Sequence, residues 1–160
     1  MGRWQQDRIG SALRGENPTV LTRMQSGFAV IGDSQFLPGY CLLLGVPKAH
    51  DLTDLPLPAR LNFLRDMSLL GEAIALICQP QRINYEIFGN TDPFLHAHVL
   101  PRYSWEPAER LAGPASHYPA EQRHAPQHQF SALQHSLLCS RLTTALHELM
   151  RQANAGVVGS

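Results

Sequence analysis

Two histidines one residue apart, His96 and His98, stand in the segment FLHAHVLPRY at positions 94–103. Side chains two residues apart on a β-strand project from the same face, so this spacing predicts neighbouring imidazoles. One neutral imidazole can act as a nucleophile, and another beside it can donate a hydrogen bond to developing negative charge. The alternatives are two ligands of a metal ion and two half-exposed histidines on an edge strand.

A metal site needs at least three ligands, and this pair supplies two. Asp92 or a distant histidine would have to complete the set, and the sequence contains neither His-Glu-x-x-His nor Cys-x-x-Cys. It contains no glycine-rich phosphate loop either. The residues therefore predict neither a metal nor a cofactor, and a metal-binding or purely structural protein is the least favoured alternative.

The composition indicates one domain spanning 1–160, because 160 residues of which 44% are hydrophobic can bury a core unaided. A formal net charge of zero offers no basic field for polymeric nucleic acid or an anionic membrane. No apolar run reaches the roughly 18 residues of a membrane span. The N-terminus lacks the apolar segment of a signal peptide, and the three dispersed cysteines are typical of reduced core thiols. We expect a cytoplasmic protein.

The elements that must position the histidines form two hairpins. GFAVIGD (27–33) and YCLLLGVP (40–47) are apolar runs separated by a Pro-Gly turn, and INYEIF (83–88) is joined to 94–103 by Gly-Asn-Thr-Asp-Pro. Between the hairpins, segment 57–78 repeats apolar residues every three or four positions, which predicts one long helix after the second strand. These patterns predict an α+β domain with an antiparallel sheet of about five strands.

The remaining third of the chain has a different composition. Segment 104–129 is rich in proline, histidine and glutamine, which predicts a loop-rich extension over the surface. Segment 130–152 has the spacing of a C-terminal helix, and the residues after it should form a frayed tail. The core would then span about 27–103.

This core resembles the histidine triad family of nucleotide hydrolases and transferases. The family is marked by His-x-His-x-His, two apolar residues and often Pro-Arg, which stand here as Phe94-Leu-His96-Ala-His98-Val-Leu-Pro101-Arg102. The family's earlier pattern is an acidic residue, Pro-Gly-His, an apolar strand and Pro-Lys-x-His. It is present in order as Asp33, Pro38-Gly39-Tyr40, CLLLGV and Pro47-Lys48-Ala49-His50. Phe94 and Tyr40 replace two family histidines, which indicates a divergent, bacterial-type branch.

The resemblance implies a role for each matched residue. His96 would attack an α-phosphorus and form a nucleotidyl-imidazole intermediate, while the carbonyl of Phe94 accepts its other ring proton. His98 would donate to a nonbridging oxygen. The predicted substrate-binding residues are Asn90, Thr91, Asp33, Tyr40, Phe94 and Arg102. Tyr40 and Phe94 are expected to pack together, and His50 is expected to be a solvent-facing residue without a catalytic role.

The function implied is hydrolysis or transfer at an α-phosphate of a small nucleotide, such as a nucleoside phosphoramidate or a dinucleoside polyphosphate. Histidine rather than glutamine at position 98 favours hydrolysis. The alternative is a nucleotide-binding module that kept the pocket and lost efficient turnover. The resemblance also implies a homodimer, because a small sheet leaves an edge or a helix face to be covered.

Overall fold

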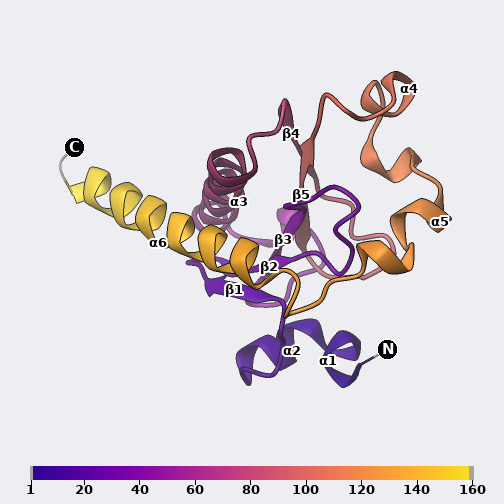
Figure 1. The fold of residues 1–160 in the computed structure, drawn as a ribbon. Coiled ribbons are helices and arrows are strands. Elements are labelled where there is room, and N and C mark those ends of the chain that lie inside the picture. The colour runs from indigo at the N-terminus through magenta and orange to yellow at the C-terminus, as the bar shows by residue number, and fades with distance from the viewer. Residues whose placement is uncertain (1, 159–160) are drawn as a thin grey trace.

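The computed structural model describes residues 2–158 and contains an antiparallel five-stranded sheet in the order β1-β2-β3-β5-β4 (Figure 1). The strands are β1 (Val20–Arg23), β2 (Gly27–Ile31), β3 (Cys41–Gly45), β4 (Arg82–Glu86) and β5 (His96–Arg102). β2 pairs with β3 and β4 with β5, as the sequence predicts for the two hairpins. β3 pairs with β5 and so joins the hairpins into one sheet.

The α+β class and the five strands confirm the prediction. Strand β1 was not foreseen, because its four residues VLTR are too short to show an alternating pattern. It pairs antiparallel with β2 and forms one edge of the sheet, while β4 forms the other.

The long helix α3 (Leu57–Cys78) has the predicted bounds and follows β3, the second strand of the first predicted hairpin. Pro58 near its start suits the first turn, where a backbone N–H has no helical partner. Gln79 ends it in the left-handed conformation, with φ of 49°. The other helices and 3-10 turns are α1 (Arg3–Gln6), α2 (Arg8–Leu13), η1 (Leu52–Asp54), α4 (Ala108–Leu111), η2 (Ala115–His117), α5 (Ala120–Arg123), η3 (Pro126–His128) and α6 (Ser136–Val158).

The C-terminal helix α6 differs from its predicted bounds at both ends. It begins at Ser136 rather than at residue 130, because the segment before it is held in a turn in which His135 bonds back to Ser131. It also continues through Val158, so the predicted frayed tail is wrong up to that residue. Asn154 accepts a hydrogen bond of 2.8 Å from Arg65 of α3, which ties this end of α6 to the neighbouring helix.

Helices α3 and α6 cover one face of the sheet (Figure 1). The core between them holds fully buried side chains from three strands, such as Leu43 and Val99, with Phe63 of α3 and Leu146 of α6. Cys41 is buried there, and burial raises the pKa of its thiol. No helix among the described residues is long and apolar enough to cross a membrane.

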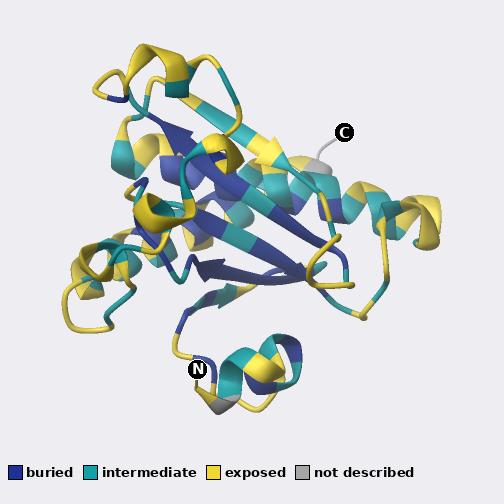
Figure 2. Cartoon of the chain, turned by 90° about the vertical axis from the view of Figure 1, so that its right-hand side faces the viewer, coloured by how far each residue is buried: buried dark blue, intermediate teal, exposed yellow. Residues whose placement is uncertain are grey.

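The opposite face of the sheet is covered in two separate places. Helix α2 packs Ile9 and Ala12 against Phe28 and Leu44 of strands β2 and β3. Residues of the extension pack elsewhere, where Leu37, Leu100 and Ala115 form a second small cluster. Figure 2 shows buried strands bordered by these partly exposed segments. The part of β5 that carries the two histidines belongs to this face.

Candidate functional site

His96 and His98 project from the same face of β5, as predicted, with ring centroids 4.9 Å apart. They lie opposite Leu44 and Leu42 of β3 in the strand register. The alternate residue between them, Ala97, points into the core under α3 and α6. The strand pairing therefore holds both imidazoles against one sheet surface, and His96 is only 5% exposed.

The ring of His96 is oriented by the backbone. Its Nδ1 lies 2.8 Å from the carbonyl oxygen of Phe94, which confirms the predicted contact. A carbonyl can only accept, so Nδ1 carries the proton and donates. In the neutral ring, Nε2 then keeps a free lone pair, which is the form that a nucleophile needs.

The ring of His98 is oriented by Tyr40, whose hydroxyl lies 2.6 Å from its Nδ1. Burial, and then the neighbouring charge of His96, lowers the pKa of His98 to about 4, although Asp92 acts in the other direction. Burial, with the charges of Asp33 and Glu86, raises the pKa of Tyr40. At neutral pH the phenol is therefore protonated and the imidazole uncharged.

The direction of this hydrogen bond decides which nitrogen of His98 carries its proton. No second hydrogen-bond partner of the Tyr40 hydroxyl exists among the described residues. We infer that the hydroxyl donates to Nδ1 of His98, which leaves the imidazole proton on Nε2. The two rings then hold opposite tautomers: His96 offers a lone pair at Nε2, and His98 offers an N–H donor at Nε2.

Tyr40 is held by the turn that precedes β3. Its carbonyl accepts from the Gly32 amide and from the side-chain amide of the buried Gln35, both at 2.9 Å. Gln35 also accepts from the Gly39 amide at 2.9 Å. A Cβ on Gly32 would lie 2.7 Å from the Tyr40 ring, so only glycine lets the ring lie this close to the chain.

The expectation that Tyr40 and Phe94 pack together is wrong. The Tyr40 ring stacks on His98 with centroids 6.0 Å apart, whereas Phe94 lies 4.9 Å from His96. The two aromatics therefore stand at opposite ends of the imidazole pair and belong to different apolar clusters. The reason is the strand register, which places residue 40 beyond His98 and residue 94 before His96.

Asp33, predicted to bind ribose, lies in an ion pair. Arg8 of α2 donates to both carboxylate oxygens, at 2.9 Å and 2.6 Å, and the Gln5 amide lies 3.2 Å from one of them. Hydrogen bonding to Asp33 outweighs burial and raises the pKa of Arg8. The motifs in 27–103 held no signal for this partner, because it comes from outside the matched segment.

Arg102, predicted to reach a phosphate, is 1% exposed and fully engaged by the protein. It pairs with Glu106 through Nη2 at 2.9 Å and Nε at 3.1 Å, and with Asn84 at 2.8 Å. Carbonyls of Gly113 and Arg110 accept from its remaining N–H groups. Burial opposes ionisation of Glu106, but hydrogen bonds from Arg102, from the Tyr103 amide and from the Tyr118 hydroxyl hold the pKa of its carboxyl below the ordinary value. The pair anchors the extension to the sheet.

A cavity of about 430 Å³ opens beside His96. Its lining comes from the turn after β3, from the end of β4 and from the start of β5: His50, Asp51, Leu52, Thr53, Ile87, Phe88, Gly89, Leu95 and His96. His50, expected to face solvent without a role, is exposed and lies in this lining. Asn90 and Thr91 are exposed in the adjoining turn.

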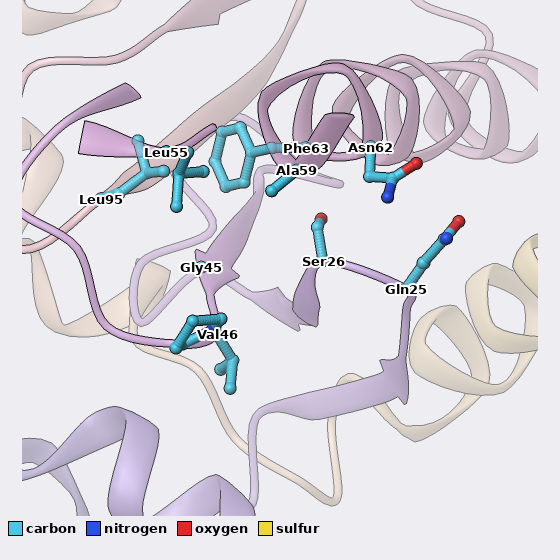
Figure 3. Close-up of a pocket in the computed structure, with 10 residues that line it drawn as sticks. Gln25, Ser26, Gly45, Val46, Leu55, Ala59, Asn62, Phe63 and Leu95 are labelled. Carbon is cyan, nitrogen blue, oxygen red and sulfur yellow. The ribbon is translucent and has the colours of Figure 1, made fainter. Parts of the chain in front are cut away.

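A smaller cavity of about 160 Å³ lies between the start of α3 and the turn at Ser26 (Figure 3). Its labelled side chains are apolar or neutral, and none of its lining residues is ionisable. Leu95 lines both cavities. Of these two cavities, only the one beside His96 is lined by ionisable side chains.

Among residues 2–158 no group of three or more histidine, cysteine, aspartate or glutamate side chains is arranged to hold a metal ion.

No family model matches the sequence, and no curated protein sequence matches it. Solved structures do match. A histidine triad protein from Marinobacter aquaeolei has a TM-score of 0.68 at 21% identity, over 81% of this chain and 89% of that one. A protein from Bradyrhizobium japonicum, also described as a histidine triad protein, has a TM-score of 0.65 at 19% identity, over 79% and 89%.

A third match is a hypothetical histidine triad nucleotide-binding protein from Sulfolobus tokodaii, with a TM-score of 0.68 at 12% identity. The alignment covers 91% of this chain and 95% of that one. At these identities the likeness is one of fold.

Proposed function

We propose that this chain, which has the histidine triad fold, is a nucleotide hydrolase or nucleotidyl transferase that acts at an α-phosphate through a covalent intermediate on His96. The observation that carries the proposal is the pair of contacts that orient the two imidazoles, from which we infer opposite tautomers. The Phe94 carbonyl leaves Nε2 of His96 with a lone pair, and Tyr40 leaves Nε2 of His98 with a proton. A phosphoryl group in reach of both rings would meet a nucleophile and a hydrogen-bond donor.

The reaction runs in two displacements. In the first, the Nε2 lone pair of His96 attacks the α-phosphorus, the bond to the leaving group breaks, and the leaving group departs with the electron pair; a basic leaving group takes its proton from solvent water. His98 donates to a nonbridging oxygen on which charge accumulates. In the second, water in a hydrolase, or an acceptor in a transferase, displaces the imidazole and releases the nucleotide. Histidine at position 98 favours water.

The other residues predicted to bind substrate differ in how far the protein leaves their polar groups free to do so. Asn90 and Thr91, exposed in the turn before β5, would supply neutral donors to the phosphate, and the rings of Phe94 and Tyr40 would bound the site. A carboxylate has about four lone-pair positions. Asp33 already accepts three hydrogen bonds, so it has room for one ribose hydroxyl. Arg102 has no free N–H left for substrate, so we assign it to the anchoring of the extension.

The alternative function is a nucleotide-binding module without efficient turnover. The observation that favours it is that two charged side chains predicted to hold substrate, Asp33 and Arg102, are already paired within the protein. The experiment is a turnover assay of the purified protein on nucleoside phosphoramidates and dinucleoside polyphosphates, with binding measured in parallel. Release of nucleoside monophosphate supports the enzyme, and saturable binding without release supports the module.

We also infer a homodimer in the cytoplasm. β4 is an edge strand, and edges expose unpaired backbone groups that another chain can cover. Tyr85 on this strand is 44% exposed, and the three free thiols suit a reducing compartment. Light scattering should give about twice the chain mass of 17.8 kDa, and a strict monomer at micromolar concentration would contradict the dimer.

A further inference from the structure

We propose that the cavity beside His96 is the leaving-group subsite of this reaction and that it accepts an apolar aromatic group without negative charge. The proposal rests on the function proposed above and adds to it the chemical class of the departing group. It also gives His50 and Phe88 a role that the sequence motifs do not assign to them.

The cavity touches only one of the two imidazoles. His96 is among its lining residues, whereas His98 is not. On the far side of His98 stands Tyr40, followed by the Asp33 turn. A phosphorus atom attacked by Nε2 of His96 would therefore have the donor of His98 on one side and the cavity on the other. The substituent that does not lie toward Asp33 would enter the cavity.

One wall of the cavity is fixed to the strand that carries the nucleophile. The amide of Leu95 donates to the carbonyl of Ala49 at 2.7 Å, which ties the turn after β3 to the start of β5. Asp51 accepts from the Thr53 amide at 2.7 Å, and Asp54 accepts from the His50 amide at 3.0 Å. These bonds hold the wall at a constant position relative to His96, as a specificity site requires.

The opposite wall is apolar and aromatic. Ile87, Phe88 and Gly89 follow β4, and Gly89 turns the chain with a φ of +67°. Phe88 is 52% exposed, and its ring centroid lies 6.2 Å from that of His98. An exposed ring at the mouth of a cavity offers a face on which a planar group can stack.

The charges of the lining residues disfavour an anionic leaving group in the cavity. None of the nine described lining residues is a lysine or arginine, and Asp51 adds a carboxylate. The lining would offer a departing diphosphate or nucleoside polyphosphate one like charge and no lysine or arginine, whereas an uncharged aromatic group would contact Leu52, Ile87 and Phe88. The polar atoms of His50 and Thr53 can bond to a substituent on such a ring. The volume of about 430 Å³ exceeds what a small leaving group alone would need.

The experiment compares three substrates that share one nucleoside 5′-phosphoryl group and differ in the leaving group: fluoride, 2-naphthylamine and a nucleoside diphosphate. We expect wild-type kcat/KM to be highest for the naphthylamide relative to the spontaneous rate of each compound. Phe88→Ala should lower kcat/KM for the naphthylamide by about tenfold more than for the fluoridate, because the fluoridate places no group on the lost stacking surface. The control Leu137→Ala removes an apolar side chain that is 71% exposed and lies outside the cavity, and it should change neither.

A second variant tests the charge argument in the opposite sense. Thr53→Lys places a cation in the lining, so it should raise kcat/KM for the substrate with the nucleoside diphosphate leaving group. Equal losses for all three substrates in Phe88→Ala would overturn the proposal, because the cavity would then hold the shared nucleoside. Unchanged kinetics in both variants would overturn it too. If no substrate modifies His96 in the wild type, the proposed function fails and the subsite fails with it. A fluoridate adduct without leaving-group selectivity defeats the subsite alone.

Discussion

The Tyr40 hydroxyl and Nδ1 of His98 lie 2.6 Å apart, although Tyr40 directly precedes β3 and His98 lies within the neighbouring strand β5, 58 positions away in the chain. Tyr40 orients the ring of His98, and the Phe94 carbonyl orients the ring of His96. Each contact is made to Nδ1 and so fixes whether that nitrogen carries the ring proton. Tyr40 therefore supplies a polarising contact to His98.

Tyr40→Phe should lower kcat while leaving the fold intact, because the ring can still pack on Gly32. In metal sites, loss of the partner that orients a ligating histidine costs about tenfold to a hundredfold, and we expect a loss of that order here. Nitrogen NMR of the His98 ring should show the proton shifting from Nε2 toward a mixture of tautomers. Tyr40→His, which keeps a hydrogen-bonding ring, should retain part of the rate that Tyr40→Phe loses. Unchanged kcat and an unchanged NMR pattern in Tyr40→Phe would show that Tyr40 does not set the tautomer of His98.

The low pKa of His98 predicts a loss of stability in acid. This histidine has a pKa of about 4 when folded, against 6.5 as its ordinary value. Between these values the unfolded chain binds more protons, so the free energy of unfolding decreases as the pH falls from about 6.5 to about 4. The loss should reach at most roughly 3 kcal/mol.

Urea unfolding at several pH values in this window measures that loss, with His98→Gln as the matched control. The variant cannot take up the proton, so its stability should depend less on pH than that of the wild type. If both proteins showed the same pH dependence, the burial of a neutral His98 would not be its source.

Gly32→Ala should disturb the site from a distance. The added Cβ would lie 2.7 Å from the Tyr40 ring, so either the ring or the turn must move. We expect a destabilisation of about 1 to 3 kcal/mol, as for other forced contacts, together with a fall in kcat like that of Tyr40→Phe. Gly156→Ala is the control, because a Cβ there meets nothing within 4 Å. Wild-type stability and activity in Gly32→Ala would show that the turn adapts freely.

Glu106→Gln should destabilise the whole chain rather than act on catalysis alone. It leaves the Arg102 charge buried without its partner, which costs about 3 to 5 kcal/mol in comparable buried pairs. Glu148→Gln breaks an exposed pair with Arg151 and should leave the free energy of unfolding almost unchanged. Thermal unfolding compares the two. Equal small effects would mean that the extension is not held by this pair.

The parts of the molecule that follow local patterns could be predicted from the sequence. Alternation placed His96 and His98 on one face, and the spacing of apolar residues gave the bounds of α3. Contacts between distant segments could not be predicted this way. The pairing of Asp33 with Arg8 depends on how α2 lies across the sheet, and no spacing in the sequence encodes it.

The burial of charged residues could not be predicted from the sequence either. Arg102 at a strand exit looks like a solvent-facing charge until the extension folds back and places Glu106 beside it. The row of Tyr40, His98, His96 and Phe94 required the register between β3 and β5, which the motif order alone does not specify.

The most direct test of the central claim is intact-mass and peptide mapping of the protein after brief reaction with an activated nucleotide. We expect one nucleotidyl group per chain, attached to His96. His96→Ala should lose the adduct and turnover while keeping the fold and nearly all nucleotide affinity, because the nucleophile contributes mainly in the covalent step. His98→Ala should still form the adduct, with turnover lowered by about a hundredfold to a thousandfold, as for loss of one charge-stabilising donor. An adduct on His50 or His98, or wild-type turnover in His96→Ala, would contradict the account.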